Sequence, residues 1–70
     1  MDKYKLEYFI KDRGYTKEQL CTEMGLSKSA FYRKCAGKTE FTLVDIKAIV
    51  RLLKLSNDEI LEIFFAEKVS

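Results

Sequence analysis

Residues 16–38, TKEQLCTEMGLSKSAFYRKCAGK, contain the signals that decide the fold of this chain. Thr16 can cap a helix that stops at Gly25, and Ser27 can cap a second helix that stops at Gly37. Glycine permits the left-handed turn with which many helices end. The stretch therefore predicts two short helices joined by a tight turn, which is the layout of a helix-turn-helix.

The flanking sequence predicts three further helices and no strands. One helix is expected from about Lys3 to Arg13, a fourth after Thr42 and a fifth after Ser56. Capping-box spacing supports three of the helix starts, at Thr16–Gln19, Thr42–Asp45 and Ser56–Glu59. The expected fold is all-α, with five helices in one compact domain that covers residues 1–70.

Apolar residues at helical spacing mark the expected core. A chain of 70 residues with a hydrophobic content of 47% can bury one modest core. The side chains expected to face inward, in chain order, are Leu6, Phe9, Ile10, Leu20, Cys21, Met24, Ala30, Phe31, Leu43, Ile46, Ile49, Val50, Leu53, Ile60, Ile63 and Phe64. Leu26 is expected to fill the corner between the second and third helices.

Composition argues against several functional classes. The chain has no histidine, and its two cysteines, Cys21 and Cys35, form no CxxC pair, so neither a metal site nor a disulfide framework is expected. Without a glycine-rich phosphate loop or paired carboxylates in a cleft, we expect no cofactor, no small-molecule ligand and no enzyme activity. The sequence shows neither a membrane-length apolar run nor a signal peptide, so we expect a cytoplasmic protein with no membrane partner.

Charge is distributed unevenly along the chain. The segment from Met24 to Lys38 contains several cations and no acid, whereas the segment from Leu55 to Ser70 contains four acids and one lysine. This pattern predicts a basic patch around the third helix and an acidic end, although a charged run is often only a solvated surface.

The third helix, at about 28–36, is the expected DNA-reading element. If Ala30 and Phe31 face inward, four polar side chains point outward: Lys28, Ser29, Tyr32 and Arg33. Arg33 can donate two hydrogen bonds to a guanine, and the others can contact bases or nearby phosphates in double-stranded DNA. Each could instead be a solvated surface residue, and Tyr32 could equally pack against a neighbour.

Phosphate contacts are expected on both sides of that helix. Candidates are the helix starts, where N–H groups favour an anion, and the cations and hydroxyls that follow the third helix. They are Thr16, Lys17, Lys34, Lys38, Thr39 and Thr42.

The segment from Lys17 to Lys38 resembles the lambda-repressor-like family, also called the XRE or Cro/repressor family. The resemblance is carried by Gln19-Leu20-Cys21, Gly25-Leu26-Ser27, Phe31 and Ala36-Gly37-Lys38-Thr39, and the order of five helices extends it over nearly the whole chain. It implies that the start of the third helix reads bases in the major groove.

The departures from the family pattern are specific. Cys21 stands where the family usually has alanine, and Phe31 stands where it has a branched aliphatic residue. Ala36 stands where the family often has an asparagine that contacts phosphate, and an alanine side chain cannot donate that hydrogen bond. The resemblance suggests a transcriptional regulator, a repressor from a phage or mobile element that acts by covering its promoter.

Surplus apolar residues suggest a homodimer. Leu61, Phe65 and Val69 lie beside the core stripe of the fifth helix and could form a two-fold contact that places two third helices about one DNA turn apart. Alternatively, the tail could cover them, or one aromatic side chain could simply be exposed. A second surplus stripe, Val44, Ala48 and Leu52, could provide the contact instead.

The main alternative function is a protein-interaction module, an adaptor or antitoxin-like partner on the same fold without specific DNA binding. The cations Lys28, Arg33 and Lys34 on and beside the third helix argue against it, because an adaptor of this kind would be expected to carry acids there.

Overall fold

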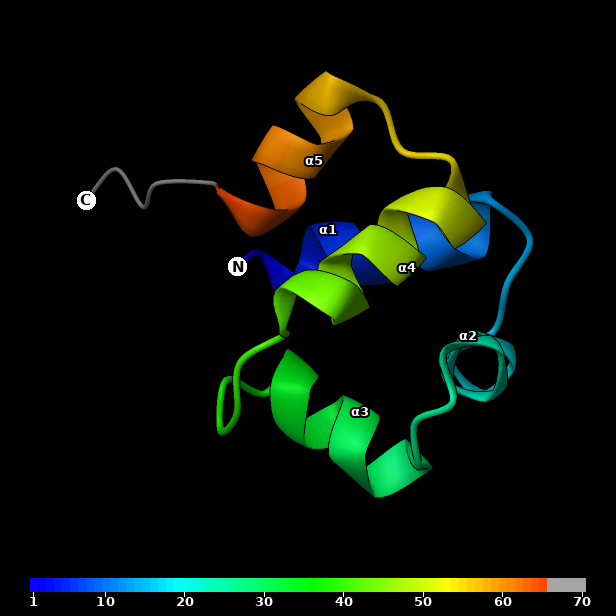
Figure 1. Cartoon of the computed structure of the whole chain (residues 1–70). Coiled ribbons are helices and arrows are strands. Elements are labelled where there is room, and N and C mark those ends of the chain that lie inside the picture. The colour runs from blue at the N-terminus through cyan, green and yellow to red at the C-terminus, as the bar shows by residue number, and fades with distance from the viewer. Residues whose placement is uncertain (66–70) are drawn as a thin grey trace.

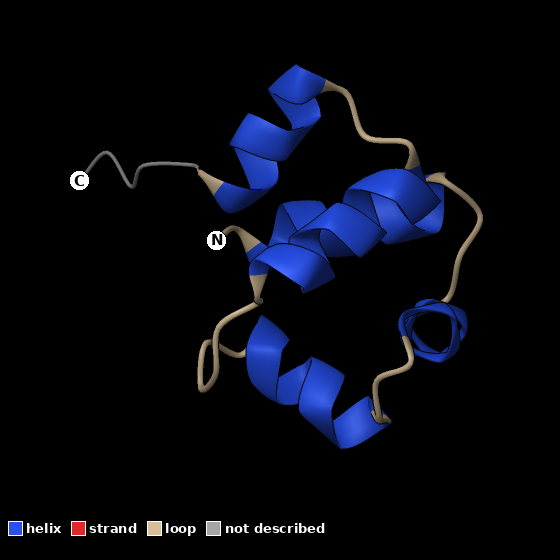
Figure 2. Ribbon diagram, viewed as in Figure 1, coloured by secondary structure: helices blue, strands red, loops and turns tan. Residues whose placement is uncertain are grey.

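Five α-helices make up the computed structural model, which describes residues 1–65 (Figures 1 and 2). Their bounds are α1 Lys3–Asp12, α2 Lys17–Met24, α3 Lys28–Cys35, α4 Leu43–Leu53 and α5 Asn57–Phe64. No strand occurs within this described range, so the expected all-α fold of five helices is confirmed. None of the helices in it is both long and apolar enough to cross a membrane.

Side chains cap the starts of the helices as the spacing predicts. Thr16 Oγ1 accepts the Gln19 N–H at 3.0 Å, and Gln19 Oε1 accepts the Thr16 N–H at 2.9 Å, which completes a capping box. The boxes at Thr42–Asp45 and Ser56–Glu59 are also formed. Local hydrogen bonds of this kind fix where each helix begins, and therefore where its N-terminal N–H groups point.

Helix ends follow two different rules. Gly25 adopts a left-handed conformation with φ 70° at the end of α2, as expected of a terminating glycine. Lys54 ends α4 in the same region with φ 51°, although it is not glycine and has a Cβ. This second turn could not be predicted from the residue type, because a left-handed lysine is uncommon.

One core joins all five helices. Its buried side chains are Leu6, Phe9, Ile10, Leu20, Cys21, Phe31, Ile49, Leu53, Leu55 and Ile63. Other expected core residues, including Met24, Ile46, Val50, Ile60 and Phe64, are only partly buried at its edge. The expected core face is therefore confirmed for every helix.

Leu43 is the exception, because its side chain is 68% exposed and the prediction that it is buried was wrong. It occupies the first position of α4, one turn before Ile46 on the same stripe. Periodicity identified the correct face of the helix, but the stripe continues past the edge of the core. Val44, the next residue, is also exposed.

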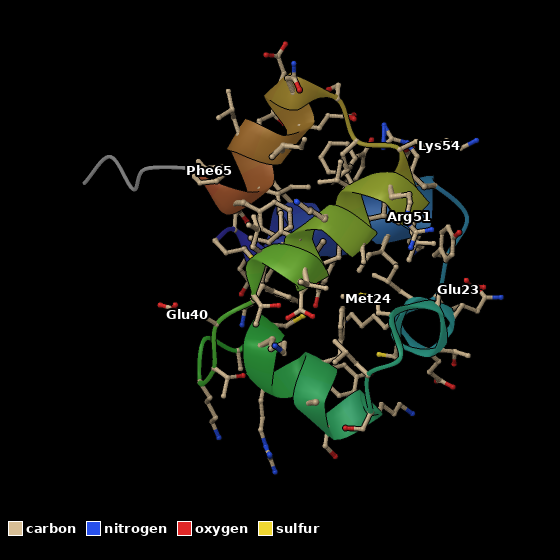
Figure 3. All side chains as sticks on the ribbon, in the orientation of Figure 1. Glu23, Met24, Glu40, Arg51, Lys54 and Phe65 are labelled. Atoms are coloured by element: carbon tan, nitrogen blue, oxygen red, sulfur yellow. The ribbon has the colours of Figure 1, made fainter. Side chains whose placement is uncertain are left out.

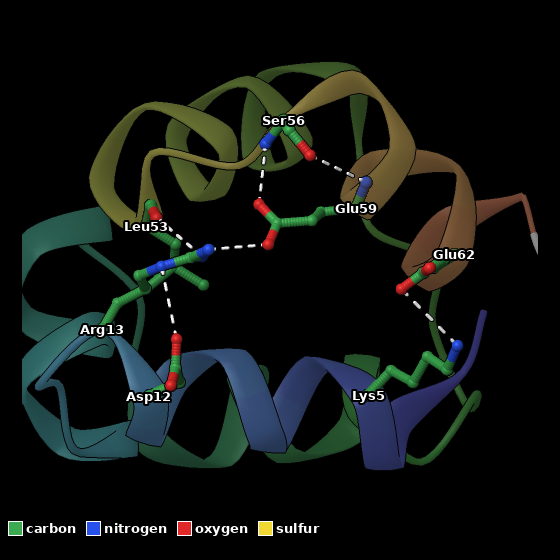
Figure 4. Close-up of polar contacts among 7 residues, drawn as sticks. All are labelled: Lys5, Asp12, Arg13, Leu53, Ser56, Glu59 and Glu62. Carbon is green, nitrogen blue, oxygen red and sulfur yellow. Dashed lines mark hydrogen bonds and ion pairs between the residues drawn. The ribbon is translucent and has the colours of Figure 1, made fainter.

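Polar contacts hold α1 against α5 (Figure 4). Arg13 Nη2 lies 2.6 Å from Glu59 Oε2, and Arg13 Nη1 donates to the Leu53 carbonyl at 3.3 Å. The N–H of Asp2, the residue that caps α1, donates to the Ile63 carbonyl at 2.7 Å. These contacts fasten one side of the core and leave α3 on the opposite side.

The arrangement places α3 at the edge of the molecule. In Figure 1, α4 crosses in front of α1, α5 lies above them, and α3 lies below α4 at the far side from α5. In this view α2 is seen down its axis, whereas α3 is seen from the side. The axes of the two helices of the helix-turn-helix are therefore steeply inclined to each other. One long side of α3 therefore faces outward.

Candidate nucleic-acid interface

The buried side chain of Phe31 determines which face of α3 points outward. Phe31 is fully buried, and its ring packs edge-on against Phe41 at 6.0 Å between centroids. With Phe31 fixed inward, Lys28, Ser29 and Arg33 are exposed. Figure 3 shows nitrogen-tipped side chains extending from the outer edge of α3 and the loop after it. An exposed helix edge is the kind of element that the major groove of DNA admits.

Arg33 and Lys28 differ in whether they form an ion pair among the described residues. Arg33 has no ion pair within residues 1–65, so its guanidinium can bind a partner without breaking one. Lys28 Nζ lies 3.4 Å from Glu18 Oε1, and both side chains are mostly exposed. Because such surface pairs contribute little, Lys28 can exchange Glu18 for a stronger acceptor at small cost.

Tyr32 is packed and exposed at once. Lys17 Nζ lies over its ring at 5.5 Å from the centroid, and Phe31 contacts it edge-on at 6.3 Å. The ring therefore bridges the start of α2 to α3 while part of it faces solvent. Both expectations for this residue, packing and an outward position, describe its placement.

The start of α2 brings a capped N-terminus beside Tyr32. Lys17 Nζ lies 2.6 Å from Glu7 Oε1, and this hydrogen bond raises the pKa of Lys17 above its ordinary value. Thr16 is exposed, and the capping box uses its side chain and N–H. The N–H groups of the first two helical residues lie outside the box, so they can donate hydrogen bonds to an anion at this end.

Lys34, an expected phosphate ligand, has a mostly buried side chain that is paired within the protein. Its side chain is 14% exposed, and Nζ lies 2.6 Å from Asp45 Oδ2. Nζ also donates to the Glu40 carbonyl at 3.2 Å and lies over the Phe41 ring at 5.9 Å from the centroid. Spacing along the helix did not indicate these contacts, because they join α3 to α4 across a loop.

The carboxylate of Asp45 responds to this environment. Burial raises the pKa of Asp45, but hydrogen bonds from Lys34 and Thr42 lower it by more, so the net pKa is below the ordinary value. A lowered pKa in the folded state stabilises the fold above the unfolded pKa of about 3.9, and that stabilisation is lost as the pH falls through the folded value. The interaction is therefore fully present at neutral pH.

Lys38, Thr39 and Thr42 lie on the exposed side of the loop after α3 and at the start of α4. The Lys38 N–H donates to the Arg33 carbonyl at 3.0 Å, so the loop folds back over the last turn of α3. Thr42 Oγ1 accepts the Asp45 N–H at 3.1 Å. These polar residues lie near the C-terminal end of α3, whereas Lys28 lies at its N-terminal end.

Neither thiol is set up for nucleophilic or metal chemistry. Burial raises the pKa of Cys21, and burial raises the pKa of Cys35 to about 11. Both sulfurs are therefore protonated at neutral pH, whereas nucleophiles and metal ligands are thiolates. The described residues also contain no cluster of three potential metal ligands. Cys21 is buried as expected for a core residue.

The expected charge contrast is weaker in space than along the chain. Glu59 is paired with Arg13, and Glu62 Oε2 lies 3.5 Å from Lys5 Nζ, so α1 partly neutralises the acids of α5. The apolar residues beside them are exposed, with Leu61 at 55% and Phe65 at 63%. Val69, the third residue expected at a dimer contact, lies outside the described residues.

A family model described as the Cro/C1-type HTH DNA-binding domain matches residues 5–66. No curated protein and no solved structure matches the chain.

Proposed function

The chain belongs to the family of Cro/C1-type helix-turn-helix DNA-binding domains, and we propose that it is a sequence-specific regulator of transcription that reads the major groove with α3. The observation that carries the proposal is the outward face of α3. Buried Phe31 orients this face, on which Arg33 has no ion pair with any residue in the range 1–65. The five helices share one core, so we treat residues 1–70 as a single DNA-binding domain.

In this proposal, Arg33 donates two hydrogen bonds to a guanine. Lys28 and Ser29 contact bases near the start of α3, and Tyr32 contacts a thymine methyl group or a phosphate. Phosphates are bound by the start of α2, at Thr16 and Lys17, and on the other side by Lys38, Thr39 and Thr42. Lys17 must share its ammonium with Glu7 to do so. Such phosphate contacts would set affinity and salt dependence.

We infer further that binding represses transcription. A domain that covers promoter DNA excludes polymerase by occupancy alone, and this needs no second activity. The basic outer edge of α3 favours DNA binding over the function of a protein-interaction module, because cations suit a phosphate-rich surface. In this proposal, the protein acts in the cytoplasm of a bacterium and binds the promoter of a phage or mobile element.

Selection from a pool of random duplexes, followed by fluorescence anisotropy, tests specific binding. We expect the selected duplex to bind at least about 1,000-fold more tightly than a scrambled duplex. The affinity for both duplexes should decrease when the salt concentration is raised from about 50 mM to 200 mM, because phosphate contacts release counterions. The regulator proposal is wrong if the selection enriches no sequence, or if the enriched and scrambled duplexes bind equally. A search for protein partners then follows.

We also propose that the protein forms a homodimer through Leu61, Phe65 and Val69. Exposed apolar side chains at the first two positions are costly in water and suit a self-complementary contact. The two α3 helices would then lie about 34–36 Å apart, one turn of DNA. The stripe on α4 is a weaker candidate because, although Val44 is exposed, Leu52 packs against the core.

Sedimentation at tens of micromolar, without DNA and with the selected duplex, tests the dimer. We expect a dimer for the unmodified protein and a monomer for Phe65→Glu, because a buried unpaired carboxylate is costly. Val44→Glu places the same charge on the other exposed apolar face and should leave the dimer intact. A monomer in both conditions would refute the proposal, and dissociation by Val44→Glu alone would move the contact to α4.

A further inference from the structure

The loop between α3 and α4 contains three of the proposed phosphate-contacting residues, and the ammonium group of Lys34 links it to α3 through side-chain contacts. Lys34 Nζ contacts the Glu40 carbonyl at 3.2 Å, the Asp45 carboxylate at 2.6 Å and the face of Phe41. The side chains of Lys34 and Asp45 are only 14% and 13% exposed. The pair is therefore shielded from solvent and is screened by salt much less than a surface pair.

Asp45 links this pair to the start of α4. The same oxygen, Oδ2, that meets Lys34 accepts the Thr42 N–H at 2.9 Å, and the Asp45 N–H donates back to Thr42 Oγ1 at 3.1 Å. The capping box of α4 and the last turn of α3 thus share one carboxylate. Displacing Lys34 would remove the side-chain link between the loop and α3. Backbone hydrogen bonds would still hold the loop, including those from the N–H groups of Lys38 and Thr39 to the Arg33 carbonyl. The displacement would also leave the charge of Asp45 without its partner beside a proposed phosphate site.

We propose that Lys34 and Asp45 are a positioning pair that sets α3 and the following loop in the geometry needed for base reading, and that Lys34 does not contact phosphate. This inference rests on the proposed function, because it assigns the pair a part in specific DNA binding. Arg33 precedes Lys34 directly, so a change at the pair shifts the backbone that aims the guanidinium. Lys38, Thr39 and Thr42 move with the same loop.

The two assignments for Lys34 predict different results. A lysine that binds phosphate weakens selected and scrambled duplexes about equally when removed and lowers the salt slope by about 1. A positioning lysine weakens the selected duplex more than the scrambled one. Asp45 provides the sharper contrast. Replacing it removes a negative charge near DNA, which favours binding by simple electrostatics, yet loss of positioning reduces discrimination.

The experiment compares Lys34→Met, Asp45→Asn and the double variant with the unmodified protein, using selected and scrambled duplexes at two salt concentrations. Lys38→Met is the matched control, because it removes one exposed cation from the same loop. We expect the selected-to-scrambled affinity ratio to fall about five- to tenfold in both single variants and no further in the double variant. Lys38→Met should keep the ratio and lower the salt slope.

Folding of the variants is checked by circular dichroism, and Lys34→Arg, which keeps the charge, should restore most of the ratio. If Lys34→Met behaves like Lys38→Met, or if Asp45→Asn keeps the full ratio, the positioning proposal is overturned. If the unmodified protein shows no discrimination, the proposed function fails, and amide exchange then tests the pair alone. Exchange at Lys38 should rise in Lys34→Met and Asp45→Asn while Leu6 is unchanged. Unchanged exchange at Lys38 would overturn the proposal.

Discussion

Phe31→Ala is expected to leave the domain largely unfolded at 37 °C. Phe31 is fully buried and contacts Phe41, and removing a buried phenylalanine side chain costs about 3–5 kcal/mol. A single hydrophobic core in a domain of 70 residues rarely supplies more than about 3–5 kcal/mol of stability. The loss is therefore comparable to the whole free energy of unfolding. Far-UV circular dichroism with thermal melts, at low micromolar protein, measures it.

Two further variants bracket that result. Tyr4→Ala removes an exposed aromatic side chain from α1 and should change stability by less than about 1 kcal/mol. Phe31→Leu restores a branched aliphatic residue at this position and should lose much less than Phe31→Ala, because most of the buried volume is retained. Similar melting temperatures for Phe31→Ala and Tyr4→Ala would show that Phe31 does not anchor α3.

Arg33→Ala is expected to reduce sequence discrimination by roughly 5- to 150-fold, because a bidentate contact with guanine accounts for about 1–3 kcal/mol of it. The effect should appear as weaker binding of the selected duplex with much less change for scrambled DNA. Stability should be nearly unchanged, since Arg33 is exposed and makes no internal ion pair within residues 1–65. Anisotropy titrations of both duplexes provide the measurement.

Arg51→Ala is the matched control for this prediction. Arg51 is also an exposed arginine near the end of a helix, but Figure 3 places it on α4 beside Lys54, away from α3. It loses the same charge and should keep discrimination. Equal losses on selected and scrambled duplexes in Arg33→Ala would instead assign Arg33 to a phosphate, and the base contact would have to come from Lys28 or Ser29.

Local rules predicted the parts of this fold that are local. Thr16, Thr42 and Ser56 each form a capping box with a residue three positions on, so sequence spacing and contact are nearly the same observation. The inward direction of Phe31 followed from helical periodicity, and with it the outward direction of Arg33. A helix fixes relative directions within itself, whatever it packs against.

Contacts between helices could not be predicted in the same way. Lys34 reads as one more cation of a basic helix, and its partner Asp45 lies 11 residues away across a loop whose path the sequence does not specify. Leu43 fails for a related reason, because periodicity assigns a face but does not say where the neighbouring helices end. The prediction of the candidate site therefore rested on the directions in which side chains leave the helix. It could not include ion pairs between helices, which decide what a charged side chain can reach.

The hydrogen bond from the Asp2 N–H to the Ile63 carbonyl has a consequence for local opening. Together with the ion pair between Lys5 and Glu62, it joins the first turn of α1 to the last turns of α5. Helix ends can fray, but these two ends share contacts, so we expect them to open together. The outer surface of α5, with Leu61 and Phe65, is therefore expected to lose part of its support when the start of α1 opens.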